Sequence, residues 1–310
     1  MDSEKKHETV VQLRNVSKKI GLKTIVDNVS FDIPRGTVFG LLGPNGAGKT
    51  SLIRMMVGLT SISQGEITIR GASVKHEFER AIRHVGAIVE NPEMYRFLSG
   101  YKNLLHSANM LPDVDRKRIK EVIALVGLET GIHQKVKTYS LGMRQRLGIA
   151  QALLHRPAVL ILDEPTNGLD PAGIRELRNH LRHLAEMEGT AVIVSSHLLS
   201  EMELMCDEIA VLQKGKLIGI KSMEELMDNH AAAETIRIET EQPQEAKEIL
   251  QREAPAIRFS IRGQSLTAEM TREEIPSVIA TLVYAGIPLM EVKREGRTLE
   301  DTFLEMTRGE

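Results

Sequence analysis

Cysteine and aromatic residues are scarce in this sequence. It contains one cysteine, Cys206, no tryptophan, and only 3% aromatic residues among 310 positions. A single cysteine excludes an internal disulfide, and the apolar neighbours of Cys206 indicate that it packs in the interior rather than acting as a nucleophile. The low aromatic content leaves little material for a platform on which nucleic-acid bases could stack.

Long hydrophobic runs and a strong charge imbalance are also missing. The longest apolar stretches, such as residues 158–162, fall far short of the roughly eighteen residues that span a bilayer. Residues 1–8 are mixed in charge and lack the apolar core of a signal peptide. The formal net charge of −2 gives no global basic footprint for nucleic acid. We therefore expect a cytoplasmic protein with no membrane span of its own and no nucleic-acid partner.

The composition that remains is that of a globular protein, with 42% hydrophobic residues. Strands are predicted at residues 9–16, 29–33, 37–42 and 66–70. Helical periodicity dominates the segment 91–156, and strands then alternate with helices between 158 and 213. This order predicts an α/β fold: an antiparallel β subdomain, a helical insertion, and a parallel sheet covered on both faces.

A change of pattern after Gly219 predicts a second domain, and we divide the chain into residues 1–229 and 230–310. After a short helix at 223–228, the predicted elements of the second domain are a strand at 235–239, a helix at 244–253, strands at 257–261 and 265–270, a helix at 273–285 and a strand at 289–294. The order βαββαβ is the ferredoxin-like arrangement. A last amphipathic helix is expected at 299–306, and the domain is expected to regulate the first one or to stabilise a dimer.

The segment from position 43 to 50 matches the phosphate-loop pattern G-x-x-x-x-G-K-[ST] and lies between a predicted strand and a predicted helix. Its residues are Gly43, Pro44, Asn45, Gly46, Ala47, Gly48, Lys49 and Thr50, with Ser51 following. Glycines let backbone N–H groups point at phosphates, and the helix N-terminus adds its dipole. We expect Lys49 to reach the β- and γ-phosphates of ATP and the Thr50 hydroxyl to ligate Mg²⁺. A glycine-rich turn without a ligand is the alternative.

Two carboxylates, Asp163 and Glu164, end the apolar strand predicted at 158–162. Parallel sheets bind ligands at the carboxyl ends of their strands. Asp163 is therefore expected to hold the water shell of the metal, and Glu164 to polarise the attacking water. The alternative is that the pair only caps the following turn.

The segment from Tyr139 to Ala150 opens a helix with Ser140 and Gly142, which together suit an anion site. An ordinary capped helix is the alternative. The segment resembles the signature motif of ABC-type ATPases, and the order of motifs over residues 9–225 is similar to that family as well. In the family, two cassettes pair head to tail. The resemblance implies that Ser140 and Gly142 contact the γ-phosphate held by the partner, and that Asp170 communicates across the interface.

The resemblance also implies that His197 binds the γ-phosphate and orients water, whereas a surface histidine is the alternative. Three departures from the family pattern stand out: Ile20 occupies the position of an aromatic that stacks on adenine, Leu141 and Met143 replace a glycine and a glutamine of the signature, and Glu90 replaces a glutamine that senses metal. Glu90 is a candidate metal ligand that couples the nucleotide to a membrane partner. The alternative is that it pairs with a nearby arginine or faces solvent.

The acidic residue at position 90, the signature variant and the tail from Leu299 to Glu305 look like the ATPases of bacterial peptide-antibiotic (bacitracin-type) resistance and lantibiotic-immunity exporters. This resemblance implies an ATP-hydrolysing subunit that uses ATP and Mg²⁺, pairs with a second ATPase subunit, and lies on the inner face of the cell membrane against a separate permease. Two alternatives are a soluble ABC ATPase acting on DNA or ribosomes and a binding module that has lost hydrolysis.

Overall fold

The computed structural model describes residues 8–90, 92–223, 234–271 and 273–295, and it divides into two compact units, residues 1–223 and 224–310. The predicted boundary at 229/230 and the predicted helix at 223–228 fall in or next to residues 224–233, and the predicted helix at 299–306 also lies outside the described residues. No helix in the described ranges is both long and apolar enough to cross a membrane.

The first unit contains two sheets. The antiparallel sheet has the order β2-β1-β4-β5, with β1 (Thr9–Ile20), β2 (Lys23–Pro34), β4 (Gln64–Ile69) and β5 (Ala72–Ser73). The second sheet has the order β10-β9-β3-β8-β7-β6, with β3 (Val38–Leu42), β6 (Val85–Ile88), β7 (Val159–Leu162), β8 (Ala191–Ser196), β9 (Glu208–Gln213) and β10 (Lys216–Ser222). Strands β3, β6, β7, β8 and β9 are parallel, and β10 pairs antiparallel with β9. The predicted parallel sheet is therefore present.

Helices cover both faces of the parallel sheet, as its continuous apolar strands require. Helix α1 (Lys49–Met56) packs in a core that joins the two sheets, where the rings of Phe31 and Phe39 stack with centroids 5.3 Å apart. Helices α6 (Pro171–Glu188) and α7 (Leu199–Met205) contact β8 and β3. The short helix α2 (Phe78–Ile82) precedes β6. Cys206 is 1% exposed, as expected for a packing residue.

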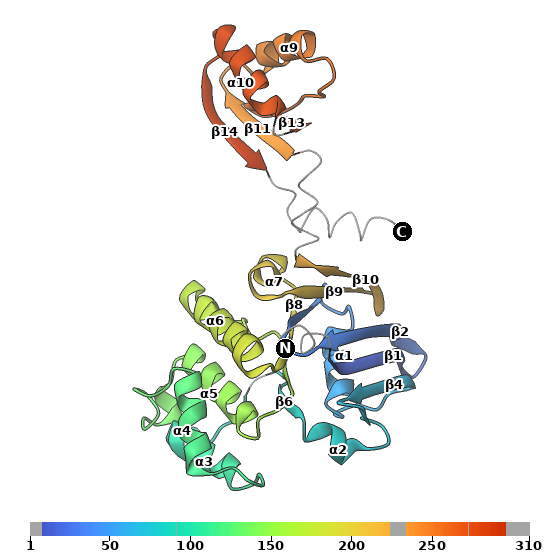
Figure 1. Ribbon diagram of the computed structural model, residues 1–310, viewed down its shortest axis with the longest axis vertical. Coiled ribbons are helices and arrows are strands. Elements are labelled where there is room, and N and C mark those ends of the chain that lie inside the picture. Colours follow the sequence, from blue (N-terminus) through green and yellow to red (C-terminus); the bar gives the residue numbers. More distant parts are fainter. Residues whose placement is uncertain (1–7, 91, 224–233, 272, 296–310) are drawn as a thin grey trace. The chain divides into compact units, whose positions relative to one another are not determined.

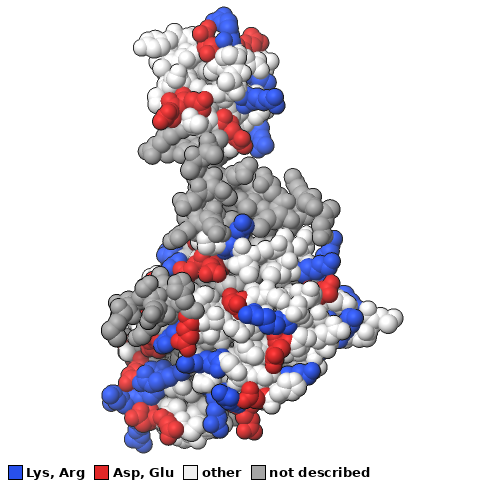
Figure 2. Space-filling view, turned by 45° about the vertical axis from the view of Figure 1, so that its right-hand side comes forward, with Lys and Arg blue, Asp and Glu red and all other residues white. Residues whose placement is uncertain are grey.

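The predicted helical insertion consists of α3 (Gly100–Ala108), α4 (Arg116–Leu125), the 3-10 turn η2 (Val136–Thr138) and α5 (Leu141–Leu153). These helices form a green lobe beside the sheets in Figure 1. Ser99, Asp115 and Ser140 cap α3, α4 and α5, each accepting a hydrogen bond from the backbone N–H three residues ahead. On the face of the molecule seen in Figure 2, basic and acidic side chains are interspersed, as the near-zero net charge suggests.

The second unit contains β11 (Glu234–Thr240), α9 (Pro243–Glu253), β12 (Ser260–Arg262), β13 (Ser265–Met270), α10 (Glu274–Tyr284) and β14 (Leu289–Glu295). Its antiparallel sheet has the order β12-β13-β11-β14. The predicted order of elements is present, but the strand predicted at 257–261 begins at Ser260. The reason is local: the backbone N–H of Ile257 donates to the carbonyl of Ala254 in a turn, and Phe259 is buried in the core.

Candidate functional site

The phosphate loop connects the carboxyl end of β3 to the start of α1, as predicted from its sequence. Gly48 has φ 106°, a left-handed conformation that a residue with a side chain rarely adopts, and helix α1 begins directly after it. A Cβ at Gly43 would lie 2.3 Å from the carbonyl oxygen of Leu212 on β9. The glycines therefore allow the loop to turn sharply and to lie close against the sheet.

Lys49 is only 5% exposed, and its ammonium group is held by this loop. Its Nζ donates to the carbonyl of Gly43 at 2.7 Å and lies 3.3 Å from Glu164 Oε1. A buried charge needs such partners, because an unpaired ammonium group would pay a large desolvation penalty. The lysine is thus fixed where its present contacts can be exchanged for phosphate oxygens.

Asp163 and Glu164 follow β7, and neighbouring strand β8 supplies a residue that links them. Ser195 Oγ donates to Asp163 Oδ1 at 2.6 Å and accepts from the backbone N–H of Glu164 at 2.8 Å. The sequence alone predicts no role for Ser195. Its signal was the polar Ser195-Ser196 pair at the end of an otherwise apolar strand, directly before His197.

Glu164 has φ 49°, in the left-handed region, which turns its side chain differently from that of Asp163. Its carboxylate lies between two predicted catalytic residues: Oε1 is 3.3 Å from Lys49 Nζ, and Oε2 is 2.9 Å from His197 Nδ1. The structure therefore brings Lys49, Glu164 and His197 into one connected cluster. The glutamate side chain is mostly buried, at 18% exposure, whereas the histidine side chain is 37% exposed.

Thr50 and Asp163 form the oxygen-rich part of the site. Thr50 Oγ1 donates to Asp163 Oδ1 at 3.3 Å. Mg²⁺ prefers hard oxygen ligands and is usually held by one or two carboxylates together with substrate phosphates and water. A hydroxyl and a carboxylate beside a phosphate loop fit that preference. These two residues are therefore suited to hold the ion with the nucleotide.

A cavity of about 690 Å³ opens over the phosphate loop. Its lining comprises Lys23, Thr24, Ile25, Asn45, Gly46, Ala47, Gly48, Lys49, Thr50, Ser51, Glu164, Asn167, His197 and Lys214. Such a volume is in the range of small-molecule sites. Ile20, at the expected adenine position, does not line the cavity and is 61% exposed, whereas Lys23, Thr24 and Ile25 at the start of β2 do line it.

Ser140, Gly142 and Asp170 do not line this cavity. Ser140 Oγ caps α5 and accepts from the N–H of Met143 at 3.2 Å, and Asp170 Oδ1 caps α6 and accepts from the N–H of Gly173 at 2.9 Å. The two caps belong to adjoining segments. A Cβ at Gly168 would lie 2.7 Å from Leu141 Cδ2, and one at Gly142 would lie 3.7 Å from Leu169 Cδ2.

Glu90 follows β6 with φ 70°. Its side chain is 64% exposed and forms an ion pair with Arg54 of α1. A pairing of Glu90 with a nearby arginine is the alternative to metal binding that the sequence leaves open. A role for Glu90 as metal ligand stays a prediction, and it requires the carboxylate to leave Arg54.

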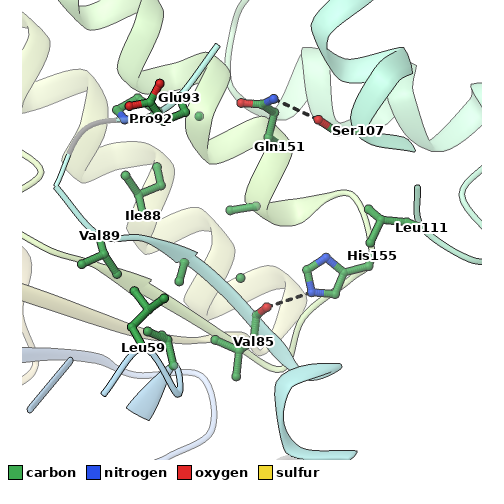
Figure 3. A pocket seen from close by; sticks show the side chains of 15 residues that line it. Leu59, Val85, Ile88, Val89, Pro92, Glu93, Ser107, Leu111, Gln151 and His155 are labelled. Carbon is green, nitrogen blue, oxygen red and sulfur yellow. Dashed lines mark hydrogen bonds between the residues drawn. The ribbon is translucent and has the colours of Figure 1, made fainter. Parts of the chain in front are cut away.

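A second cavity, of about 550 Å³, lies where β6 meets the helical insertion. We call it the helical groove. Figure 3 shows its apolar wall, including Val89, Ile88 and Leu59, and two hydrogen bonds within it. Gln151 Nε2 donates to Ser107 Oγ at 2.9 Å, and His155 Nε2 lies 3.0 Å from the carbonyl of Val85. Burial lowers the pKa of His155, so its imidazole is neutral at pH 7.

The strand, glycine loop, helix and strand-end carboxylates together define a P-loop nucleotide-binding cassette. The ABC transporter family model matches residues 26–167. The chain is 56% identical over 300 residues to the ABC transporter ATP-binding protein YhcH of Bacillus subtilis, covering 97% of this chain and 96% of the relative. The chain therefore belongs to the ABC transporter ATP-binding proteins, and it is an ATPase of that family. This confirms the family inferred from the signature and the motif order.

Two relatives carry names that describe transport. The bacitracin transport ATP-binding protein BcrA of Enterococcus faecalis is 32% identical, covering 97% of each chain. The lantibiotic transport ATP-binding protein SrtF of Streptococcus pyogenes is 41% identical, covering 74% of this chain and all of SrtF. Among solved structures, the cassette MJ0796 in a dimeric post-hydrolysis state with ADP and Pi is 25% identical with a TM-score of 0.61, covering 69% of this chain and 98% of that one. These findings support the transport function and not the nucleic-acid alternative.

Proposed function

We propose that this chain hydrolyses ATP to power a bacterial exporter of a peptide antibiotic or lantibiotic, with Mg²⁺ as the metal. The observation that carries the proposal is the connected cluster of Lys49, Glu164 and His197 at the cavity over the phosphate loop. The cargo rests on the names of BcrA and SrtF. No comparable support exists for an action on DNA or ribosomes.

The residues of the cluster have separable roles in hydrolysis. The backbone N–H groups of the loop and the ammonium group of Lys49 bind the β- and γ-phosphates. Glu164 accepts a proton from the attacking water, whose oxygen forms the new bond to the γ-phosphorus while the bond to the bridging oxygen breaks and leaves ADP. His197, next to Glu164 Oε2, orients that water and the γ-phosphate. Thr50 and Asp163 would hold Mg²⁺, which would supply neutralisation of the negative charge on the phosphates.

We propose that a second ATPase subunit completes the site in a head-to-tail dimer. Ser140 and Gly142 do not line the cavity of their own chain, and the nearest atom to a Cβ at Gly142 is 3.7 Å away, so there is room at this position. A glycine with that much room suits the close approach of a ligand from outside. The similar cassette MJ0796 is dimeric in its post-hydrolysis structure, which supports the pairing of two such subunits.

We propose that a cytoplasmic segment of a separate permease docks in the helical groove, which puts the subunit on the inner face of the membrane. The apolar groove includes Val89, next to Glu90. Glu90 pairs with Arg54 of α1, the helix that begins with Lys49. A segment bound in the groove would therefore contact Val89, and the neighbouring residue Glu90 is joined by its ion pair with Arg54 to the helix that follows the phosphate loop.

We further propose that the C-terminal unit has the ferredoxin-like fold and serves regulation or dimerisation. Its elements follow the order βαββαβ, and its sheet places the first and third strands in the centre, β11 and β13. It contains none of the phosphate-binding residues.

Replacing Glu164 with Gln tests the central assignment. We expect ATP binding to persist while phosphate release falls by about a hundredfold or more, because an amide cannot accept the proton. Glu186→Gln, on the exposed surface of α6, is the matched control and should behave as the parent. Hydrolysis by Glu164→Gln at the parental rate would mean that another group is the base.

A further inference from the structure

Strand β14 (Leu289–Glu295) is the outer strand of the C-terminal sheet and pairs, within the described residues, with β11 alone. Figure 1 shows it at the edge of that unit. An outer strand presents a row of backbone N–H and C=O groups that can pair with another strand. Met290 and Val292 of β14 are 59% and 38% exposed, so the edge also carries apolar side chains that remain accessible.

The two faces of this sheet differ. Helices α9 and α10 cover one face, where Ile236, Ile238, Leu266, Leu250 and Leu282 form the core. Because side chains alternate along a strand, Arg237 and Glu239 of β11 point to the other face, together with their partners Lys293 and Glu291 on β14. Glu291 and Lys293 are both exposed.

Charges across β11 and β14 are badly matched. Arg237 is directly opposite Lys293, and Glu239 is directly opposite Glu291. Like charges directly opposite each other destabilise a sheet. Arg237 also donates from Nε to Ser265 Oγ on β13 at 3.0 Å. At these directly opposite positions, the charges of β14 are therefore not complementary to those of β11.

A second copy of β14 can place opposite charges across from Glu291 and Lys293. In an antiparallel pair, two residues that are directly opposite each other point to the same face of the sheet. When a two-fold axis relates two copies of one strand, this condition is met only if the axis passes through a residue, which is then opposite its own copy. An axis at position 291 puts Glu291 opposite Glu291, and an axis at position 293 puts Lys293 opposite Lys293. An axis at Val292 puts Val292 opposite Val292 and Glu291 opposite Lys293 on both sides. Of these three registers, the charges favour the one centred on Val292.

We propose that two copies of this chain associate through antiparallel pairing of their β14 strands about Val292, which joins the two C-terminal sheets into one. A single strand pair buries little surface, so the contact is weak alone and strengthens when another contact already holds the two chains together. Glu291 and Lys293 disfavour pairing of β14 with the edge strands of other proteins, because charged side chains on an edge strand oppose such pairing. They permit this register, because each is then opposite a residue of the other sign. The pairing does not depend on ATP hydrolysis.

Disulfide trapping of the nucleotide-free full-length chain tests the register. In a Val292→Cys variant the axis brings two introduced cysteines to a Cα separation of about 4.5–5.5 Å, which is within disulfide range. The native Cys206 is 1% exposed, and burial raises the pKa of its thiol, so it contributes no background. We expect dimers to form at least about tenfold faster than in Tyr284→Cys, a control at a 91% exposed position.

Charge exchange sharpens the test. In the Val292→Cys background, Lys293→Glu should slow trapping because Glu291 then faces a glutamate, and adding Glu291→Lys should restore it. Neither change threatens the fold, because each one places an opposite charge across from Arg237 or Glu239. The proposal is overturned if Val292→Cys links no faster than Tyr284→Cys, if Glu291→Cys or Lys293→Cys links fastest, or if the double exchange fails to restore trapping.

Discussion

The phosphate loop and the signature helix each place a helix N-terminus where an anion can bind, but the two regions are built differently. Around the phosphate loop, hydrogen bonds and an ion pair join Lys49 of α1, Asp163 and Glu164 after β7, and Ser195 of β8. Around the signature, Ser140 caps only its own helix. Buried charges demand partners within the chain, whereas an exposed cap is satisfied by its own backbone. The charged groups of the first region are therefore paired within one chain, whereas the ligand proposed for the second region is held by another chain.

The largest effect, a loss of ATP affinity, is expected from removing the buried ammonium group of Lys49 at the phosphate loop. Lys49→Ala removes the ammonium group that we propose binds the phosphates, and it leaves Glu164 without its ion-pair partner. Truncating one member of a buried charge pair typically costs enough to weaken binding by about a hundredfold or more. Isothermal calorimetry with ATP measures this. Lys214→Ala is the control, because Lys214 lines the same cavity but is exposed. We expect that variant to lose less than about fivefold in ATP affinity.

Mixing two inactive variants tests whether the second region acts on the other chain. Lys49→Ala disables the phosphate loop, and Gly142→Asp is expected to disable the signature by placing a negative charge at the phosphate approach. A heterodimer of the two retains one intact site made of the Gly142→Asp chain's loop and the Lys49→Ala chain's signature. Random pairing should therefore restore about a quarter of parental phosphate release. A mixture as inactive as its components would argue against a composite site.

A smaller effect is expected at Ser195 of β8, which is hydrogen-bonded to the two residues that follow β7. Ser195→Ala removes the hydroxyl that bonds Asp163 and accepts from the N–H of Glu164. Loss of an outer-shell partner of a metal ligand typically costs about 10–100-fold in metal affinity or activity. We expect the Mg²⁺ concentration for half-maximal hydrolysis to rise by about tenfold. Ser196→Ala, whose hydroxyl donates to Glu201 instead, should leave that concentration nearly unchanged.

The smallest effect is expected at the nucleotide's base. Ile20 is 61% exposed and does not line the cavity, so it adds little adenine recognition. Stacking on an aromatic ring contributes roughly 1–3 kcal/mol per base in single-stranded nucleic-acid binders. Because position 20 is exposed, we expect the low end of this range: Ile20→Tyr should tighten ATP binding by about fivefold and improve discrimination against GTP. Unchanged dissociation constants for both nucleotides would indicate that the base is held at the start of β2, near Lys23.

The predictions that succeeded share a physical basis. The phosphate loop, the apolar strand before Asp163 and the cap at Ser140 are contiguous patterns, so chain order alone predicts their local structure. The predictions that missed or stayed open concern residues far apart in the chain. Ser195 meets Asp163 only because β8 lies beside β7, and Glu90 meets Arg54 only because β6 ends near α1. The late start of β12 reflects the turn in which the N–H of Ile257 donates to the carbonyl of Ala254, which a strand pattern does not reveal.

The sequence by itself determined the nucleotide chemistry of this protein, because a glycine loop, its lysine and a strand-end carboxylate pair are specified by spacing and residue type. It also determined the order of elements in both units, because hydrophobic periodicity follows from local geometry. Only the tertiary structure decided which charged side chains lie next to one another. It joined Glu164 to both Lys49 and His197, and it set Lys293 opposite Arg237 across β11 and β14. Strand register and sheet order settle such pairings, and neither is encoded in a short stretch of chain.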